Sequence, residues 1–334
     1  MSEQRTKSFE RNQSLESLLN EINTDLSIVE EKLVKQFDLD MPIIFIMGPH
    51  RSGSTLIMQW LANTGVISYP TNLLSRFYQA PIMGAKLQLL LADERYNYRD
   101  ELKDFSSEIN YESDNGKTKG ALAPNEFWYF WRRFLPFSEL DYLPTDQLLA
   151  RSDTETLTAE FAGMMKVLQK PMALKAMILN YNIDFLDQLF EKAIFIYTKR
   201  DPLTNIESAL KARERQLGSI DKWYSFLIPE YHELIKLNPY EQVAGQIYYI
   251  NQAVESGLAK VAEHKKITVQ YEDFCANPKA VFEELKEKLA ANGYQEDMEY
   301  SLQKNFNVTR KECTDQNIVS AYEYFLRGET FSER

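Results

Sequence analysis

The chain has little of what a metal site or a disulfide framework requires. Only two cysteines, Cys275 and Cys313, and three histidines occur among its 334 residues. The cysteines lie far apart, and neither stands at metal-ligand spacing from a histidine, so we expect reduced thiols and no metal ion. Such thiols are typical of a cytoplasmic protein, which is the location we expect.

Long apolar runs and basic clusters are also missing. No run approaches the roughly 20 apolar residues of a membrane span, and the polar segment 1–13 has no apolar core of signal-peptide length. The formal net charge is −11, with no run rich in Lys or Arg. We therefore expect neither a membrane nor a nucleic acid as a partner, because an acidic chain suits a neutral or cationic small molecule better than a polyanion.

The composition does allow a large folded core. Apolar residues make up 44% of the chain and charged residues 26%, which is ordinary for a globular protein. Short apolar runs alternate with stretches of helical spacing, which predicts a three-layer α/β/α domain with a central parallel sheet, enlarged by helical insertions. The glycine-containing loop described below makes the P-loop nucleotide-kinase type the expected variant of this fold. The predicted strands cover residues 43–47, 172–176, 193–198 and 266–270.

An amphipathic helix from Ser14 to Phe37 precedes the first strand. Its apolar stripe favours packing against the domain over a coiled coil between two chains, because about three heptads make a short run. A homodimer through this helix stays an alternative. We expect an N-terminal helical segment at 1–40, the α/β domain at 41–295 with a capping insertion at about 66–170, and a helical tail at 296–334.

The stretch from Pro42 to Gly65 reads as a buried strand, a tight polar turn and a helix. The turn is Gly48-Pro49-His50-Arg51-Ser52-Gly53-Ser54-Thr55. Such a turn leaves backbone N–H groups unpaired at the start of a helix, where the macrodipole also favours an anion. It therefore predicts a cradle for a phosphate-like group, although an ordinary turn with two glycines is the alternative.

This turn nearly fits the P-loop pattern G-x-x-x-x-G-K-[ST]. Gly48 and Gly53 have the spacing and Thr55 the hydroxyl position, but Ser54 stands where the lysine belongs. Without that lysine, the only fixed positive charge in the loop is Arg51. We expect a phosphate-like anion that is not the tail of ATP.

Other candidate residues follow later strands. Lys175 ends a short apolar strand, and it should point at an anion beyond the strand ends, because a buried ammonium without a partner is costly. A snorkelling lysine on an edge strand is the alternative. Arg200 follows the next strand in the turn R-D-P, and Ser208, eight residues on, can face the same cleft.

Residues 123–134 form the densest aromatic cluster. They predict a helix opened by Pro124, with one buried aromatic face. Glu126 lies near the start of this helix, beside the aromatic wall. We expect burial to raise its pKa, as a general base near neutral pH requires. The aromatic face consists of Phe127, Phe130, Trp131 and Phe134.

The loop G-x-x-R-S-G-[ST]-T after a strand resembles the 5′-phosphosulfate loop of the sulfotransferases that use 3′-phosphoadenylyl sulfate (PAPS). The turn R-D-P, about 150 residues later, is similar to their second signature, and V-x-Y-E-D-F followed by N-P resembles their last core strand and helix. The match runs from residue 42 to about 290 and is nearer to the tyrosylprotein-type and bacterial enzymes than to the cytosolic ones. It implies PAPS as cofactor and transfer of its sulfuryl group to a hydroxyl or amine of an acceptor, which the composition suggests is a small molecule or natural product.

The resemblance also implies roles for the candidates. Arg200 and Ser208 hold the 3′-phosphate, and Lys175 steadies the leaving phosphosulfate. Relatives usually place a catalytic glutamate past the loop arginine, but Thr71 and Asn72 occupy that place here. The base stays open between Glu126, which we favour, and His50. The implied nucleotide-binding residues are Arg51, Ser52, Gly53, Ser54, Thr55, Arg200 and Ser208, and the catalytic candidates are Lys175, Glu126, His50 and Arg51.

Two other functions fit the same pattern. A small-molecule or nucleotide kinase shares the fold and the loop, but it would bind ATP with magnesium. A non-catalytic nucleotide-binding module, dimerised through the first helix, would show no turnover and would lose its dimer when residues 1–38 are deleted. Sulfuryl transfer needs no metal, because the sulfonate carries less charge than a terminal phosphate and the sequence has no carboxylate cluster to hold one.

Overall fold

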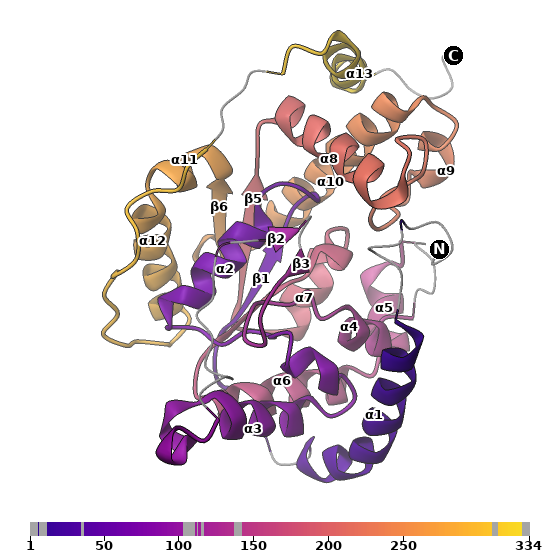
Figure 1. Cartoon of the computed structure of the whole chain (residues 1–334). Helices are drawn as coiled ribbons and strands as arrows, with labels where there is room; N and C mark the ends of the chain where they lie inside the picture. Colours follow the sequence, from indigo (N-terminus) through magenta and orange to yellow (C-terminus); the bar gives the residue numbers. More distant parts are fainter. Residues whose placement is uncertain are drawn as a thin grey trace.

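A computed structural model of the chain has a central parallel sheet with helices on both faces (Figure 1). It describes residues 6, 12–34, 37–102, 111, 113–114, 117–136, 142–308 and 313–328. The four strands lie in the order β4-β1-β5-β6, and every neighbouring pair is parallel. This confirms the predicted fold class and strand positions. The strands are β1 (Ile43–Met47), β4 (Met172–Lys175), β5 (Ala193–Lys199) and β6 (Lys266–Gln270).

Side chains that alternate along the strands divide the core into two halves. Phe45 faces a cluster that includes residues of α6, α7 and α10, whereas Ile44 and Ile46 face a cluster with residues of α2, α11 and α12. Both faces of β1 are therefore buried, which explains its uninterrupted apolar run. These helices are α2 (Ser54–Thr64), α6 (Thr154–Leu168), α7 (Ile183–Leu189), α10 (Pro239–Leu258), α11 (Tyr271–Ala276) and α12 (Pro278–Ala291).

The strand order brings the carboxyl ends of β4, β1 and β5 to one edge of the sheet. Ile46 is paired with Lys175 on one side of β1, and Met47 with Tyr197 on the other. A Cβ on Gly48 would lie 2.5 Å from the carbonyl oxygen of Thr198, so the loop leaves β1 in close contact with β5. Residues far apart in sequence are thereby collected around the loop.

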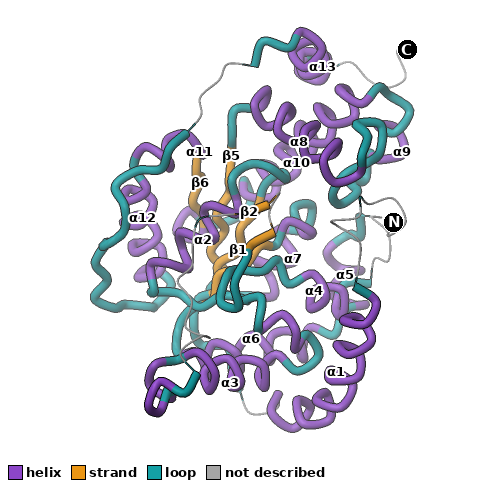
Figure 2. Tube along the Cα trace, in the orientation of Figure 1, coloured by secondary structure: helices purple, strands orange, loops and turns teal. Residues whose placement is uncertain are grey.

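The helix α1 packs against α3 and α6 in the lower part of the molecule as drawn (Figure 2). Buried Asn23 of α1 donates to the carbonyl of Arg76 and accepts from the backbone of Gln79, each at 2.8 Å. Buried Glu30 accepts the backbone N–H groups of Ile82 at 2.6 Å and Met83 at 3.1 Å. The favoured packing of the first helix against the domain is thus present, while a homodimer through it stays a prediction.

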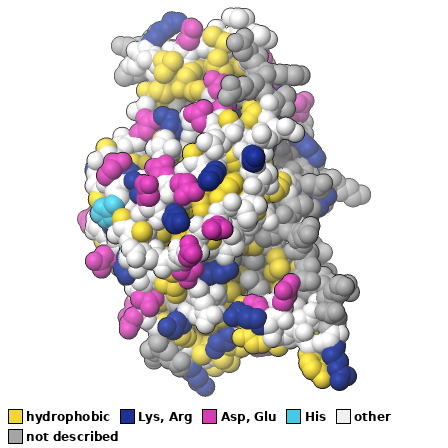
Figure 3. Space-filling model, turned by 90° about the vertical axis from the view of Figure 1, so that its left-hand side faces the viewer, with side chains coloured by type: hydrophobic (Ala, Val, Ile, Leu, Met, Phe, Trp, Pro, Cys, Tyr) yellow, Lys and Arg dark blue, Asp and Glu magenta, His cyan; other side chains and the backbone are white. Residues whose placement is uncertain are grey.

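The other helices and strands surround this sheet, and their bounds are given at the end of this paragraph. No helix of the described residues is both long and apolar enough to cross a bilayer. On the face shown in Figure 3, basic and acidic side chains are interspersed rather than gathered by sign. These elements are α1 (Gln13–Val34), α3 (Pro81–Ala92), β2 (Ser113–Asp114), β3 (Lys117–Thr118), α4 (Trp128–Phe134), α5 (Thr145–Arg151), α8 (Pro202–Leu217), α9 (Tyr231–Leu234) and α13 (Gln316–Leu326).

The aromatic cluster forms its helix later than predicted. α4 begins at Trp128, and Phe127 before it has a φ of 57°. Pro124 instead pairs with Thr71 in an antiparallel bridge, and the side chain of Asn125 accepts the N–H of Phe127 at 2.9 Å. These contacts keep residues 124–126 outside the helix. The predicted aromatic face is buried as expected, with Phe127, Phe130, Trp131 and Phe134 at most 4% exposed.

Candidate functional site

The turn after β1 presents backbone amides at the start of α2. Ile57 donates to the carbonyl of Gly53 at 3.1 Å, so the N–H groups of Ser54 and Thr55 precede this hydrogen bond of the helix. Arg51 and Gly53 have positive φ values of 65° and 96°, which curl the loop around its own amides. The curled amides and the helix dipole together suit a tetrahedral anion.

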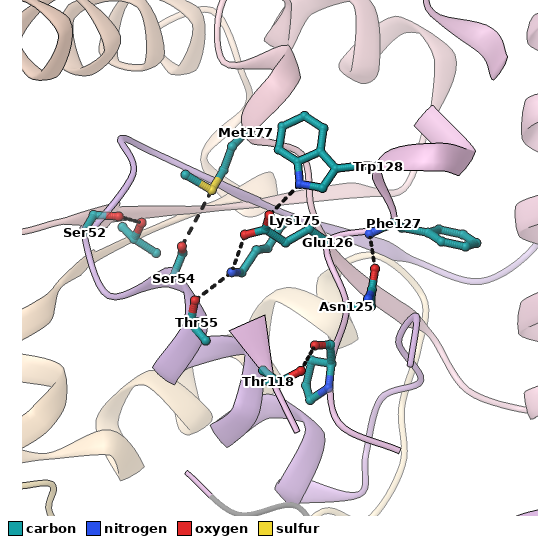
Figure 4. A network of polar contacts seen from close by, with 12 residues as sticks. Ser52, Ser54, Thr55, Thr118, Asn125, Glu126, Phe127, Trp128, Lys175 and Met177 are labelled. Atoms are coloured by element: carbon teal, nitrogen blue, oxygen red, sulfur yellow. Dashed lines mark hydrogen bonds and ion pairs between the residues drawn. The ribbon is translucent and has the colours of Figure 1, made fainter. Parts of the chain in front are cut away.

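Lys175, at the end of β4, places an ammonium group beside the loop, which has Ser54 in the position of the P-loop lysine. Its Nζ donates to Oγ1 of Thr55 at 2.8 Å and pairs with Oε1 of Glu126 at 3.0 Å (Figure 4). The side chain is only 6% exposed, so the alternative of a snorkelling surface lysine is wrong. Trp131 donates to the Lys175 carbonyl at 3.3 Å and supports the end of the strand.

Glu126 is bonded through both carboxylate oxygens. Oε1 meets Lys175, and Oε2 accepts from the indole Nε1 of Trp128 at 2.5 Å (Figure 4). Burial alone would raise the pKa of Glu126, but the charge of Lys175, the two hydrogen bonds and the charge of Arg51 hold it below its usual range. The predicted rise of this pKa is therefore wrong, because the charge of Lys175 and, after it, the hydrogen bond from Trp128 outweigh burial.

A small pocket opens beside the Lys175–Glu126 pair. One of its lining residues, Met177, accepts a hydrogen bond from Oγ of Ser54 at 3.7 Å and so connects the pocket wall to the start of α2. Glu126 and Lys175 line one part of this pocket, and apolar and aromatic side chains line the rest. A hydroxyl or amine placed there would contact both the carboxylate of Glu126 and the ammonium of Lys175. Its lining residues are Glu126, Trp128, Trp131, Lys175, Met177 and Ile178.

On the other side of the loop, the two basic turns touch each other. Nε of Arg51 donates to Oγ of Ser208 at 3.3 Å, and Nη1 of Arg200 donates to the carbonyl of Arg51 at 3.1 Å. Nε of Arg200 is buried and has no partner among the described residues. Because buried donors are almost always satisfied, this nitrogen marks a place for an acceptor oxygen.

These residues fit the anionic groups of PAPS. The loop amides suit one tetrahedral anion, and the Arg51, Arg200 and Ser208 group suits a second. Not every predicted loop side chain faces this space, because Oγ of buried Ser52 is hydrogen-bonded to Oγ1 of Thr198 at 2.6 Å. The side chain of Ser52 therefore connects the loop to β5, and its backbone N–H donates to the carbonyl of Pro49 at 3.4 Å within the loop.

The structure separates His50 from the other candidates. Its ring is 5% exposed and packs edge-on against Tyr224 and Phe226, and neither ring nitrogen has a partner among the described residues. Burial, together with the charges of Arg51 and Arg213, lowers the pKa of His50 to about 3. A ring in this state is neutral and a weak base, so its surroundings favour a packing role.

Two residues of this region were not among the predicted site residues. Trp128 holds Glu126, and Tyr271 lies against Gly53 and under the guanidinium of Arg200. A signal for Tyr271 was present, since it stands in the V-x-Y-E-D-F stretch that was used only to recognise the fold. No comparable signal marks Trp128, because its contact depends on the late start of α4.

Comparison with known sequences decides the family. Residues 42–295 match the sequence model of the sulfotransferase family. The chain belongs to the sulfotransferase family. This confirms the resemblance inferred from the loop and the R-D-P turn. A search of curated protein sequences returned no match for this sulfotransferase.

Solved sulfotransferase structures are similar to it only at a distance. STF9 from Mycobacterium avium aligns at 14% identity and a TM-score of 0.49, covering 95% of this chain and 86% of that one. STF1 from Mycobacterium tuberculosis H37Rv aligns at 14% identity and a TM-score of 0.49, covering 93% and 80%. The sulfotransferase domain from the curacin biosynthetic pathway aligns at 14% identity and a TM-score of 0.42, covering 86% and 98%. We carry no residue role over from them.

Proposed function

We propose that this sulfotransferase transfers the sulfuryl group of PAPS to a hydroxyl or amine of a small-molecule acceptor. The observation that supports it most is the arrangement of basic groups at one edge of the sheet. Lys175 meets Thr55 on one side of the loop, and Arg51 meets Ser208 on the other. Two anions at the two ends of one nucleotide would match this arrangement.

In the proposed reaction, PAPS supplies a sulfuryl group whose bond to the bridging oxygen breaks as the acceptor atom bonds to sulfur. The amides of residues 53–55 hold the sulfonate end, and Lys175 neutralises the charge that develops on the bridging oxygen. Arg51, Arg200 and Ser208 hold the 3′-phosphate end. The desulfated product is 3′-phosphoadenosine 5′-phosphate (PAP).

Glu126 is the proposed general base. Its carboxylate borders the pocket and is deprotonated at neutral pH, although the lowered pKa also makes it a weaker base while Lys175 is bound to it. His50 fits this role less well, since its ring is enclosed against Tyr224 and Phe226 and does not line the pocket. Lys175 holds Glu126 at 3.0 Å, and a shift of this ammonium toward the donor would release the carboxylate.

The acceptor and the cellular location belong to the same proposal. The pocket beside Glu126, of about 10 Å³, has room for one water-sized group, so it suits the reacting hydroxyl or amine of a small molecule or natural product rather than the whole acceptor. The two free thiols, Cys275 and Cys313, suit a cytoplasmic location.

Calorimetry with PAP and with ATP tests the donor. We expect PAP to bind and ATP with magnesium to bind at least tenfold more weakly. A preference for ATP would contradict the proposal and favour the kinase alternative. A screen of small alcohols, phenols and amines with labelled PAPS then identifies the acceptor, and the labelled product distinguishes O- from N-sulfation.

A further inference from the structure

Tyr271 lies between the two anion-binding turns and contacts both. It directly follows the edge strand β6. A Cβ on Gly53 would lie 2.2 Å from Cδ2 and 2.6 Å from Cε2 of Tyr271, so the ring fills the space against Gly53. The guanidinium carbon of Arg200 lies 4.9 Å from the centre of the same ring. One side chain thus connects the loop after β1 with the turn after β5.

Arg200 has few other groups to orient it. Nη1 of Arg200 donates to the carbonyl of Arg51 at 3.1 Å. Nε of Arg200 is buried and has no hydrogen-bond partner in the described part of the chain. The ring of Tyr271 supplies a face that attracts the cation without occupying its N–H groups. The guanidinium is therefore held in place with a donor still free for a ligand oxygen.

The neighbours of Tyr271 fix its position relative to the R-D-P turn. Glu272 accepts the backbone N–H of Asp201 at 3.3 Å, and Gln270 donates to the other carboxylate oxygen of Glu272 at 2.6 Å. Burial raises the pKa of Tyr271 to about 12, so the ring under Arg200 is a neutral phenol. The contact is therefore one between a cation and an aromatic face, not an ion pair.

We propose that Tyr271 is a positioning residue for nucleotide binding, whose ring sets the distance between the Gly53 backbone and the Arg200 guanidinium. Both turns then meet the two anionic ends of one ligand together. The aromatic face does this work, and the hydroxyl does not. This inference rests on the proposed function, because it assumes that both turns hold the same nucleotide.

The test measures PAP affinity by calorimetry in Tyr271→Phe and Tyr271→Leu. Phenylalanine keeps the aromatic face, so we expect an affinity within about twofold of wild type. Leucine keeps bulk against Gly53 but loses the face, so we expect PAP to bind about 3- to 30-fold more weakly. Tyr294, a half-buried tyrosine three residues beyond the end of α12, supplies the matched control: Tyr294→Leu should leave PAP affinity unchanged.

A second measurement needs no ligand. Urea unfolding of Tyr271→Leu, Arg200→Ala and the double variant completes a thermodynamic cycle. We expect the two changes to be coupled, with the double variant more stable than the sum of the single losses predicts. A cycle that is additive would overturn the inference, because the ring would then act without Arg200.

The outcomes separate this inference from the function on which it rests. A wild-type chain that binds no PAP overturns the proposed function and this inference together. A wild type that binds PAP, with a Tyr271→Leu variant that binds equally well, overturns the inference alone. The same holds if Tyr271→Phe loses as much affinity as Tyr271→Leu, since the hydroxyl would then be the working group.

Discussion

Nε of Arg51 donates to Oγ of Ser208 across 3.3 Å, although 157 positions separate the two residues. The resemblance to PAPS-dependent enzymes places Arg51 in the phosphosulfate loop and Ser208 with the 3′-phosphate. Their contact joins the loop to α8, and the hydrogen bond from Arg200 to the Arg51 carbonyl joins it to the R-D-P turn that begins this helix. A substitution in one turn should therefore also disturb the other turn. We expect substitutions in either turn to lower the affinity for the nucleotide.

Arg51→Ala and Arg200→Ala should each weaken PAP binding. Each change removes a charge-assisted contact of about 1.5–3 kcal/mol, which corresponds to a loss of affinity of about 10- to 150-fold. Calorimetry measures the loss. Arg95→Ala is the matched control, because Arg95 is 56% exposed and paired with Asp93. Unchanged affinity in both site variants would refute the assignment of the two turns.

Gly53→Ala should abolish the donor site, whereas Gly65→Ala should not. Both glycines have positive φ, 96° and 71°, so both substitutions strain the backbone. Only at Gly53 would the new Cβ meet another group, the ring of Tyr271 at 2.2 Å, while nothing lies within 4 Å at Gly65. We expect Gly65→Ala to lower the free energy of unfolding by about 1 kcal/mol and to bind PAP normally. Equal PAP affinities in the two variants would contradict this difference.

Glu126→Gln should lower kcat by about 10²- to 10⁴-fold while PAP still binds, because it removes the proposed base. Trp128→Phe makes a finer change, since it removes the hydrogen bond that helps to lower the pKa of Glu126. The pKa of Glu126 should then rise, and the acid limb of the pH–rate profile should move to higher pH. The assay uses the acceptor found in the labelled-PAPS screen. A limb that stays in place would argue against Glu126 as the base.

The folded chain should become less stable as the pH rises toward neutrality, because of Glu160 in α6. Burial, opposed by Arg133 and reinforced by Glu30, raises the pKa of Glu160 from 4.5 to about 7. The folded chain then keeps a proton that the unfolded chain loses above pH 4.5, so this contribution to stability is full below pH 4.5 and is lost as the pH rises through about 7. The change in the free energy of unfolding is at most about 3 kcal/mol.

Urea unfolding between pH 4 and pH 8 measures this dependence. Glu160→Gln should flatten it, because the amide does not titrate. Glu233→Gln, on the exposed helix α9, should leave it as in wild type. An unaltered slope in Glu160→Gln would show that other groups cause the dependence.

The sequence predicted the sheet and the loop because local patterns determine them. The apolar run of β1 and the glycine spacing of the loop are properties of short segments. The environment of Glu126 depends instead on where α4 begins, which the bridge between Thr71 and Pro124 helps to set. The enclosure of His50 likewise depends on Tyr224 and Phe226, which come from a segment more than 170 residues away. Such long-range contacts leave no local periodic signal.

The seating of α1 has a practical consequence for anyone who prepares this protein. The family match begins at residue 42, which invites a shortened expression clone starting there. A chain that starts there would lack Glu30, which accepts the backbone N–H groups of Ile82 and Met83. It would also lack Asn23, which accepts the backbone N–H of Gln79 just before α3. The truncated product would expose to solvent the surfaces of α3 and α6 that α1 covers, so the first helix should be retained in any minimal version.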